Sequence, residues 1–245
     1  MDNFKLPEQV VVEDGAVRER YVAFCDVLGF SNAVKKDFVA ASKVYVDFIN
    51  SVRLMEPIGP AEVTVYSDSI LVTSDELAPV LSTVKLLWWA ALLNDWLIRG
   101  GVAYGRVWQH QTGKDLFVVS EPLVKAAQIE KTIRVPAVAV DPSIAIPMEL
   151  WLPRFASGPL SGSLLHFGGM SIVNPFNPFW FQSAYTRVAQ LLEDSPQHSE
   201  KYYWFLALAE QVGANEAALV PPEVLATLEQ QGIVKFVPNE PADEG

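Results

Sequence analysis

The chain has 245 residues, of which half are apolar and 19% are charged, so it is expected to fold around a substantial core. Its formal net charge is −11, and it has no basic cluster that could neutralise the phosphates of a duplex, so DNA or RNA duplexes are poor candidate partners. A nucleotide ligand is still compatible with this charge, because bound cations can supply positive charge locally. Cys25 is the single cysteine, which excludes an internal disulfide and fits a cytoplasmic protein.

The first part of the chain predicts a strand followed by a helix. Residues 1–18 are polar and irregular, and we expect a flexible lead-in there. Residues 21–27 form a short apolar run that ends before Gly29, which is typical of a central strand. Apolar residues then recur near helical spacing from Val34 to Val52, and this helix should end before Pro57.

A hairpin and a long helix are predicted next. Residues 62–66 alternate as a strand, residues 70–73 read as a second strand, and the small polar residues 67–69 suit a tight turn between them. A long helix is predicted from about residue 76 to 98, with Gly100 and Gly101 as its stop. Its most apolar part contains Lys85 and Asp95, so we expect a buried helix and no membrane span.

The following elements complete a known topology. Strands are predicted at residues 102–108, 116–119 and 135–140, and Pro122 can open a helix from about residue 123 to 132. The order strand, helix, strand, strand, helix, strand predicts an α+β fold, a ferredoxin-like βαββαβ palm with helices on one face and further α and β elements appended. We place this palm domain at residues 19–142. Polymerase palms and nucleotide cyclases use the scaffold, but so do unrelated proteins, so topology alone does not give function.

The composition changes after residue 142. Prolines and aromatic residues become frequent, as in the segment NPFNPFWF, and two or three helices are predicted. We expect a mostly helical extension in residues 143–236, with a dimerisation or regulatory role, and a disordered acidic tail in residues 237–245. No chemistry is visible in this part of the sequence.

Asp26 closes the first apolar strand. A carboxylate in such a position is costly to bury without a partner. The turn and the helix N-terminus that follow it offer amides and positive potential to an anion. A carboxylate and a bound anion repel each other unless a cation lies between them. A divalent metal ion bound with a triphosphate would be such a cation.

Asp68 lies at the tip of the predicted hairpin. In a ferredoxin-like sheet the first and third strands are neighbours, which brings the hairpin tip beside the end of the strand that carries Asp26. Two carboxylates on neighbouring strand ends can bind two hard cations, which activate an attacking oxygen and neutralise a leaving phosphate. Taken singly, Asp68 could be a turn residue and Asp26 a helix cap, whereas the pair together favours metal binding.

Four segments resemble those of one protein family and occur in its order. FCDVLGFS resembles the first metal-binding segment of class III nucleotide cyclases, and VYSDSILV resembles their metal hairpin. IRGGVAYGRVW resembles their next strand, and EPLVKAAQIEK resembles the helix after it, which ends in Glu130. The forms LGF, YSDS and RGG are most similar to the Pycsar cyclases, the bacterial pyrimidine cyclases of anti-phage signalling. The set covers residues 20–140.

This resemblance implies a two-metal nucleotide site. Asp26 and Asp68 would bind two divalent ions, Mg²⁺ or Mn²⁺, with Val27 as a further metal ligand. The residues expected along the triphosphate are Val27, Leu28, Gly29 and Phe30.

Several positions depart from the family pattern. The lysine and the acid with which purine cyclases read their base are matched here by Thr64 and Phe117. This pair favours a smaller pyrimidine ring against an aromatic wall. The family's transition-state Asn and Arg fall at Val124 and Gln128, and neither side chain can do that work.

Three cations are candidates to supply the missing positive charge. They are Arg99, Arg106 and Lys125, with Arg99 and Lys125 as the expected catalytic residues and Arg106 as a substrate contact. The alternative is that they are ordinary surface or sheet-edge cations.

The resemblance implies conversion of UTP, less readily CTP, to the 3′,5′-cyclic mononucleotide and pyrophosphate. The enzyme would be a cytoplasmic homodimer whose product signals in anti-phage defence. The absent Asn and Arg leave open a catalytically inactive nucleotide-binding sensor with a cyclase-like palm. A palm-type polymerase or dinucleotide synthase ranks last, because the chain lacks an obvious site for a second nucleotide.

Overall fold

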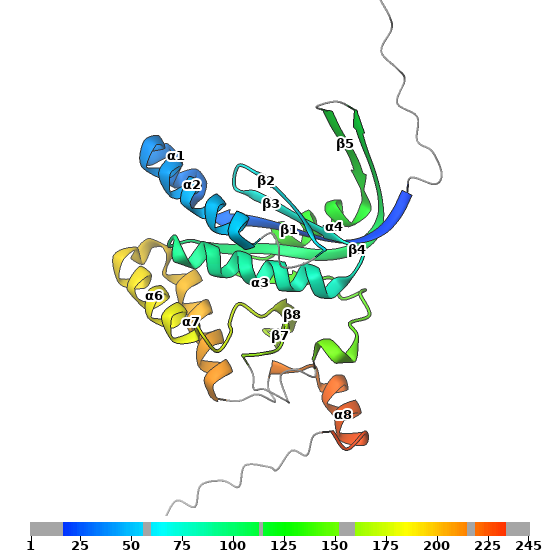
Figure 1. The fold of residues 1–245 in the computed structure, drawn as a ribbon. Helices are drawn as coiled ribbons and strands as arrows, with labels where there is room; N and C mark the ends of the chain where they lie inside the picture. Colours follow the sequence, from blue (N-terminus) through cyan, green and yellow to red (C-terminus); the bar gives the residue numbers. More distant parts are fainter. Residues whose placement is uncertain (1–16, 56–59, 113–114, 152–159, 215–218, 234–245) are drawn as a thin grey trace, which may run out of the picture.

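The computed structural model describes residues 17–55, 60–112, 115–151, 160–214 and 219–233 (Figure 1). Most of the expected lead-in and the whole of the expected acidic tail lie outside the described residues. The strands are β1 (Val17–Leu28), β2 (Glu62–Tyr66), β3 (Ser69–Ser74), β4 (Leu97–Thr112), β5 (Asp115–Ser120), β6 (Val138–Val140), β7 (Leu164–Phe167) and β8 (Met170–Val173). The helices are α1 (Phe30–Lys36), α2 (Phe38–Met55), α3 (Leu77–Leu93), α4 (Glu121–Thr132), α6 (Phe181–Asp194), α7 (Ser199–Ala214) and α8 (Pro222–Gln230), with 3₁₀ turns η3 (Met148–Leu150) and η4 (Pro196–His198).

The first four strands and their crossovers form the palm that the sequence predicts. The sheet runs in the order β2-β3-β1-β4-β6-β8-β7, with β5 paired to β4 beyond this path. The part β2-β3-β1-β4 is the ferredoxin-like order, with α1 and α2 connecting β1 to β2 and α3 connecting β3 to β4. Central β1 is antiparallel to both neighbours, and Asp26 lies opposite Ser69 of β3 and opposite Arg99 of β4. The predicted α+β palm is confirmed.

Helices cover both faces of the palm sheet. α3 packs on one face, where Cys25 and Val102 are buried among apolar side chains, and α2 packs beside α3 (Figure 1). α4 covers the other face so closely that a Cβ on Gly101 would lie 2.5 Å from the carbonyl oxygen of Ala126. Because side chains alternate along a strand, Asp26 points to the α4 face, opposite to Cys25.

α3 ends earlier than the sequence predicts. Its last residue is Leu93, and Asp95, with φ of +64°, turns the chain into β4. Gly100, predicted as part of a helix stop, lies inside β4 instead. A Cβ on Gly100 would lie 2.4 Å from the carbonyl oxygen of Phe24, so this glycine allows β4 to approach β1 closely.

The extension is mostly helical, as predicted, and it also adds two strands to the palm's sheet. Ile172 of β8 lies opposite Ala139 of β6, which joins the β7–β8 hairpin to the palm. Gly168 and Gly169 form the hairpin turn with φ of +60° and +76°, the backbone conformation that a two-residue hairpin turn needs. The sheet therefore continues across the expected domain boundary.

Aromatic residues fix α7 against the palm. The rings of Trp88 on α3 and Phe205 on α7 have centroids 5.7 Å apart, and Phe176 lies 5.1 Å from Phe205. Phe176 belongs to the segment NPFNPFWF, and its amide donates to the side-chain oxygen of fully buried Asn174 at 2.9 Å. Palm and extension share one continuous core.

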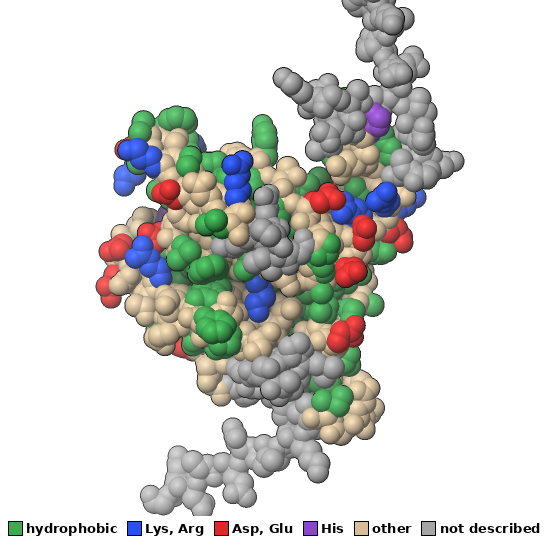
Figure 2. Space-filling model, in the orientation of Figure 1, with side chains coloured by type: hydrophobic (Ala, Val, Ile, Leu, Met, Phe, Trp, Pro, Cys, Tyr) green, Lys and Arg blue, Asp and Glu red, His purple; other side chains and the backbone are tan. Residues whose placement is uncertain are grey.

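The surface combines scattered charges with exposed apolar side chains. Figure 2 shows acidic and basic side chains interspersed on the face it presents. The exposed apolar residues include Phe38, Val39 and Val46 on α2, and Val119 on β5 and Val124 on α4. Within the residues described by the structure, no helix is both long and apolar enough to cross a bilayer.

Candidate active site

Asp26 and Asp68 lie on adjacent backbone segments at one edge of the palm. β2 and β3 are joined by the two-residue turn Ser67–Asp68, in which Ser67 has φ of +55°. The amide of Val27 donates to the carbonyl oxygen of Asp68 at 2.9 Å, so the β1–β3 pairing extends to the hairpin tip. The predicted meeting of the first strand's end with the hairpin tip is therefore present.

The surroundings of the Asp26 carboxyl disfavour its ionised form. Its side chain is only 23% exposed, and burial is the largest cause that raises its pKa. The negative charges of Asp68 and Glu130 raise the pKa further, while Arg99 and Lys201 lower it. Burial and the two carboxylates together outweigh the two cations, and the pKa of Asp26 is about 6.

The two aspartates fit divalent cations that are shared with a substrate. Their carboxylates are the hard oxygen ligands that Mg²⁺ and Mn²⁺ prefer. Burial is the main cause of the raised pKa of Asp26, and a cation would offset the negative charges of Asp68 and Glu130 that add to it. Within the described parts of the chain, no group of three or more His, Cys, Asp or Glu side chains could hold a metal. Phosphate oxygens and water would complete the coordination, as is usual for Mg²⁺ bound with a nucleotide.

The turn after Asp26 is held in place from two sides. Gly29 has φ of +91° and precedes the first residue of α1, a conformation that glycine adopts without steric cost. Phe30 packs its ring against Tyr45 and Trp96, with centroids 5.1 and 5.7 Å away. Ser31 donates from Oγ to Oδ2 of Asp68 at 3.0 Å. The residues expected along a triphosphate thus lie next to both aspartates.

Arg99 connects Asp26 to a buried acid of α4. Its Nη2 lies 3.5 Å from Oδ2 of Asp26, and its Nε lies 2.5 Å from Oε1 of Glu130. The Glu130 side chain is 7% exposed, so its carboxylate needs a compensating cation, and the Arg99 guanidinium provides it. In the sequence, Glu130 stands out only as the last acid of a family-like helix. The feature that could have identified Glu130 is a carboxylate at a helix position where the pattern of apolar residues predicts burial.

The other two candidate cations are engaged elsewhere in the same chain. Lys125 forms an ion pair with Asp141 and donates to Oγ of Ser143 at 2.9 Å. Arg106 forms an ion pair with Glu121, and both of these side chains are exposed. Arg99 is the one of the three predicted cations that the structure brings to Asp26.

The two candidate base contacts lie at opposite ends of the palm. Thr64 is on edge strand β2, opposite Leu71, and points away from the core side to which Val63 and Val65 pack. Phe117 is on β5, opposite His110 of β4. His110 is eleven positions beyond Arg99, which corresponds to about 35 Å of strand.

The positions of the missing Asn and Arg are solvent-facing. Val124 and Gln128 both lie on α4 and both are exposed. Phe117 is also 45% exposed. Within one chain these residues therefore do not close over the aspartates.

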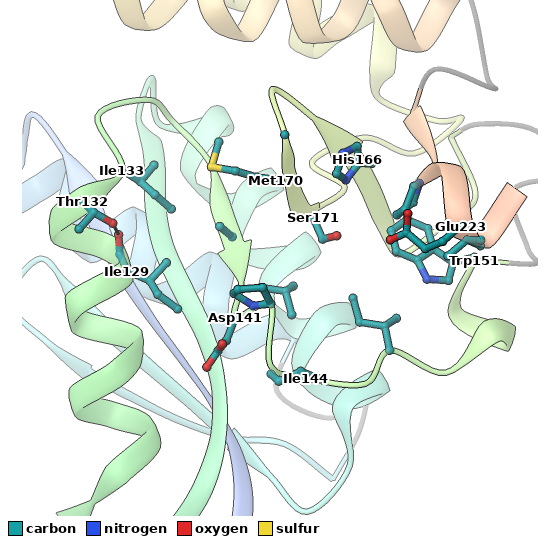
Figure 3. Close-up of a pocket in the computed structure, with 17 residues that line it drawn as sticks. Ile129, Thr132, Ile133, Asp141, Ile144, Trp151, His166, Met170, Ser171 and Glu223 are labelled. Carbon is teal, nitrogen blue, oxygen red and sulfur yellow. Dashed lines mark hydrogen bonds between the residues drawn. The ribbon is translucent and has the colours of Figure 1, made fainter.

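A separate cavity of about 510 Å³ lies between the palm and the extension (Figure 3). Ile129 and Ile133 of α4 line one side, and Trp151 and His166 line the other (Figure 3). Neither Asp26 nor Asp68 lines it. This mostly apolar cavity is thus distinct from the paired aspartates, and the sequence did not reveal it.

Comparison with known proteins gives structural neighbours only. No protein-family model and no curated protein matches the chain. It is similar to the adenylyl cyclase CyaB from P. aeruginosa, with 12% identity, TM-score 0.42 and coverage of 51% of this chain and 78% of that one. It is also similar to the guanylate cyclase domain of RhGC from Catenaria anguillulae in complex with GTP, with 15% identity, TM-score 0.40 and coverage of 51% and 79%.

A bacterial light-regulated adenylyl cyclase is a further neighbour, with 14% identity, TM-score 0.43 and coverage of 51% of this chain and 44% of that one. These neighbours are adenylyl and guanylyl cyclase domains, and the similar part is about half of this chain. With identity this low, substrate and chemistry have to be inferred from the chain's own residues.

Proposed function

We propose that the chain is a nucleotide cyclase that converts a pyrimidine nucleoside triphosphate, UTP in preference to CTP, to its 3′,5′-cyclic mononucleotide. The observation that most supports this is the juxtaposition of Asp26 and Asp68 beside the Gly29 turn. A cytoplasmic location and a signalling role in anti-phage defence belong to the same proposal, and they rest on the sequence resemblance.

The reaction is an intramolecular phosphoryl transfer. The ribose 3′ oxygen forms a bond to the α-phosphorus, and the bond from that phosphorus to the α,β-bridging oxygen breaks with its electron pair remaining on pyrophosphate. The proton of the 3′ hydroxyl is lost to solvent. Two divalent cations held by Asp26, Asp68 and Val27 would supply the charge that favours the 3′ alkoxide and the departing pyrophosphate.

The protein's own residues would position the substrate. Leu28, Gly29 and Phe30 lie next to the aspartates, where their backbone can follow the triphosphate. Arg99 shares its charge between Asp26 and Glu130, so its role is to hold the Asp26 carboxylate in place on the α4 face. Lys125 and Arg106 would have to leave their present acidic partners to reach a substrate.

A homodimer would complete the site. Phe117 lies about 35 Å along the strand from the register position of Asp26, which favours its meeting a nucleotide at the aspartates from a second subunit. The exposed apolar residues Phe117, Val119 and Val124 provide a surface for that contact. Base selection by Thr64 and Phe117 would then take one residue from each subunit.

The direct test is incubation of the full chain with each of the four nucleoside triphosphates and Mn²⁺, with products separated by chromatography. We expect cyclic UMP from UTP and a smaller amount of cyclic CMP from CTP. One pyrophosphate should be released for each cyclic nucleotide formed. Asp26→Asn and Asp68→Asn should each abolish the product, whereas exposed Asp47→Asn should not. Absence of a cyclic product from all four triphosphates would refute the proposal.

A non-catalytic sensor is the second candidate. The exposed Val124 and Gln128, at the places where family members carry the transition-state Asn and Arg, favour it. This candidate predicts tight binding of a triphosphate in the presence of Mn²⁺ without pyrophosphate release. The same incubation, followed by calorimetry with UTP, separates the two.

A further inference from the structure

A cavity of about 330 Å³ lies beside the turn that follows Asp26, between the palm and the extension. Leu28, Gly29 and the first turn of α1 form its palm side. η4 and the beginning of α7 form the other side, through His198 and Lys201. The extension therefore contributes side chains directly next to the candidate triphosphate turn.

The charged side chains that line this cavity are predominantly basic. Lys36 comes from α1, Lys201 from α7, and His198 adds an imidazole. The acid among the lining residues, Asp95, forms an ion pair with Arg187, which compensates its charge. Across the described ranges, no ion pair neutralises Lys36 or Lys201.

Lys201 lies on a helix that is packed on the palm, and its charge acts on Asp26. It lies on the same helix as Phe205, which packs on Trp88 of α3, so its backbone is anchored to the palm. Its side chain is only partly exposed. Its ammonium group is close enough to Asp26 to lower the pKa of that carboxyl, which places it in electrostatic range of the proposed metal site.

We propose that this cavity is an anion subsite for the two terminal phosphates of the nucleotide, and that Lys201 of the extension is its main cation, assisted by Lys36 and His198. The inference rests on the proposed function and deepens it. The subsite holds the β- and γ-phosphates, and after bond cleavage it holds the same atoms as pyrophosphate. In this role the extension supplies positive charge that the exposed Gln128 of α4 does not.

The test uses inorganic pyrophosphate with Mn²⁺ as the probe, bound to the full chain and measured by calorimetry. We expect Lys201→Gln to weaken pyrophosphate binding about tenfold, the scale of a lost hydrogen bond to a charged group. Lys201→Arg should restore most of the affinity. Lys35→Gln is the matched control, because Lys35 is an exposed lysine on α1 that does not line the cavity.

A second measurement separates a substrate contact from a structural effect. UMP lacks the terminal phosphates, so its affinity should be the same for Lys201→Gln and the wild type. In an active enzyme, Lys201→Gln should raise KM for UTP and the inhibition constant of pyrophosphate together. Circular dichroism of each variant verifies that α7 is intact.

The outcomes distinguish this inference from the proposed function. Pyrophosphate binding that depends on Lys201 in a chain without cyclase activity would support the subsite and refute the enzyme. Pyrophosphate binding by Lys201→Gln equal to that of the wild type would overturn the subsite, even in an active cyclase. An equal loss of UMP and pyrophosphate affinity, or no pyrophosphate binding by the wild type, would overturn it as well.

Discussion

Arg99 lies opposite Asp26 across the β1–β4 pair, and its guanidinium reaches the Asp26 carboxylate at 3.5 Å. The same guanidinium lies 2.5 Å from Glu130, a buried acid of α4. One arginine thus forms ion pairs with two carboxylates, and Asp68 adds a third negative charge nearby. The site is short of positive charge, which is the condition under which bound cations contribute most.

The raised pKa of Asp26 predicts how the stability of the metal-free protein depends on pH. Asp26 holds its proton up to a pKa of about 6 in the folded chain, against an ordinary value of 3.8. The folded state therefore binds this proton more tightly than the unfolded state, and stability falls as pH rises from about 4 to about 6. Asp26→Asn removes the effect, so its Tm should exceed that of the wild type above pH 6.

This prediction is checked by thermal denaturation in EDTA between pH 4 and 7.5. The difference in Tm between Asp26→Asn and the wild type should shrink toward zero near pH 4, where both side chains are uncharged. Asp47→Asn, at an exposed site on α2, should show no such pH dependence. A wild type that is more stable than Asp26→Asn at pH 7.5 without metal would contradict the argument.

Addition of metal and nucleotide should reverse that order. Mn²⁺ with a non-hydrolysable UTP analogue should raise the Tm of the wild type by several degrees. At ligand concentrations about 100 times the dissociation constant, the stabilisation is about 2.7 kcal/mol. Asp26→Asn and Asp68→Asn should lose most of this shift, whereas equal shifts in all three proteins would exclude the aspartates as metal ligands.

The ion pair between Arg99 and Glu130 should contribute measurably to stability. Glu130 is 7% exposed, so Glu130→Gln leaves the guanidinium without its closest charged partner. We expect Glu130→Gln to lower the free energy of unfolding by about 1–3 kcal/mol. Urea denaturation of Arg99→Met, Glu130→Gln and the double variant should reveal a coupling energy, and additive effects would show that the two side chains do not stabilise each other.

The sequence predicted the palm because its signals are local. The two-residue turn at Asp68 and the alternation of β2 specify the hairpin, and strand order then places Asp68 beside Asp26. The segment around Gly100 was misassigned because glycine next to a helix pattern usually ends the helix. Here the glycine allows close approach of a neighbouring strand, and that constraint arises only when β4 meets β1.

The remaining differences also come from tertiary contacts. Residues 30–55 form two helices and not one, because the backbone of Asp37 is extended. Oδ1 of Asp37 accepts a hydrogen bond from the amide of Ala40 at 3.0 Å, at the start of the second helix. The hairpin at Gly168 and Gly169 carried a recognisable turn signal, but its place in the sheet depends on pairing with β6. The charge arrangement around Glu130 could not be read from spacing, since its partner is 31 positions away in the sequence.

Two glycines offer a matched test of helix packing on the palm. A Cβ on Gly101 would lie 2.5 Å from the carbonyl oxygen of Ala126, so Gly101→Ala must displace α4. We expect a loss of about 1–3 kcal/mol of stability, the usual cost of overpacking. Gly213→Ala in α7 meets nothing within 4 Å and should stabilise by up to about 1 kcal/mol. Urea denaturation measures both, and a neutral Gly101→Ala would contradict the close packing of α4.

Subunit complementation tests whether the active site spans two chains. If Asp26 comes from one subunit and Phe117 from its partner, a mixed dimer of Asp26→Asn and Phe117→Ala contains one site with both residues native and one site with both changed. Each variant alone should have little UTP turnover. After equimolar mixing under conditions that allow subunit exchange, about one quarter of all sites should be native, because half of the dimers are mixed.

The expected recovery is therefore about a quarter of wild-type turnover, measured as cyclic UMP formed per chain. A mixture of Asp26→Asn with Asp68→Asn is the control, since both aspartates come from the same chain and every site in the mixed dimer remains impaired. Its activity should stay at the level of the single variants. Recovery in this control, or no recovery with Phe117→Ala, would refute a site shared between the subunits, because that site pairs the Asp26 of one chain with the Phe117 of the other, whose β4 register partner His110 lies eleven positions beyond Arg99.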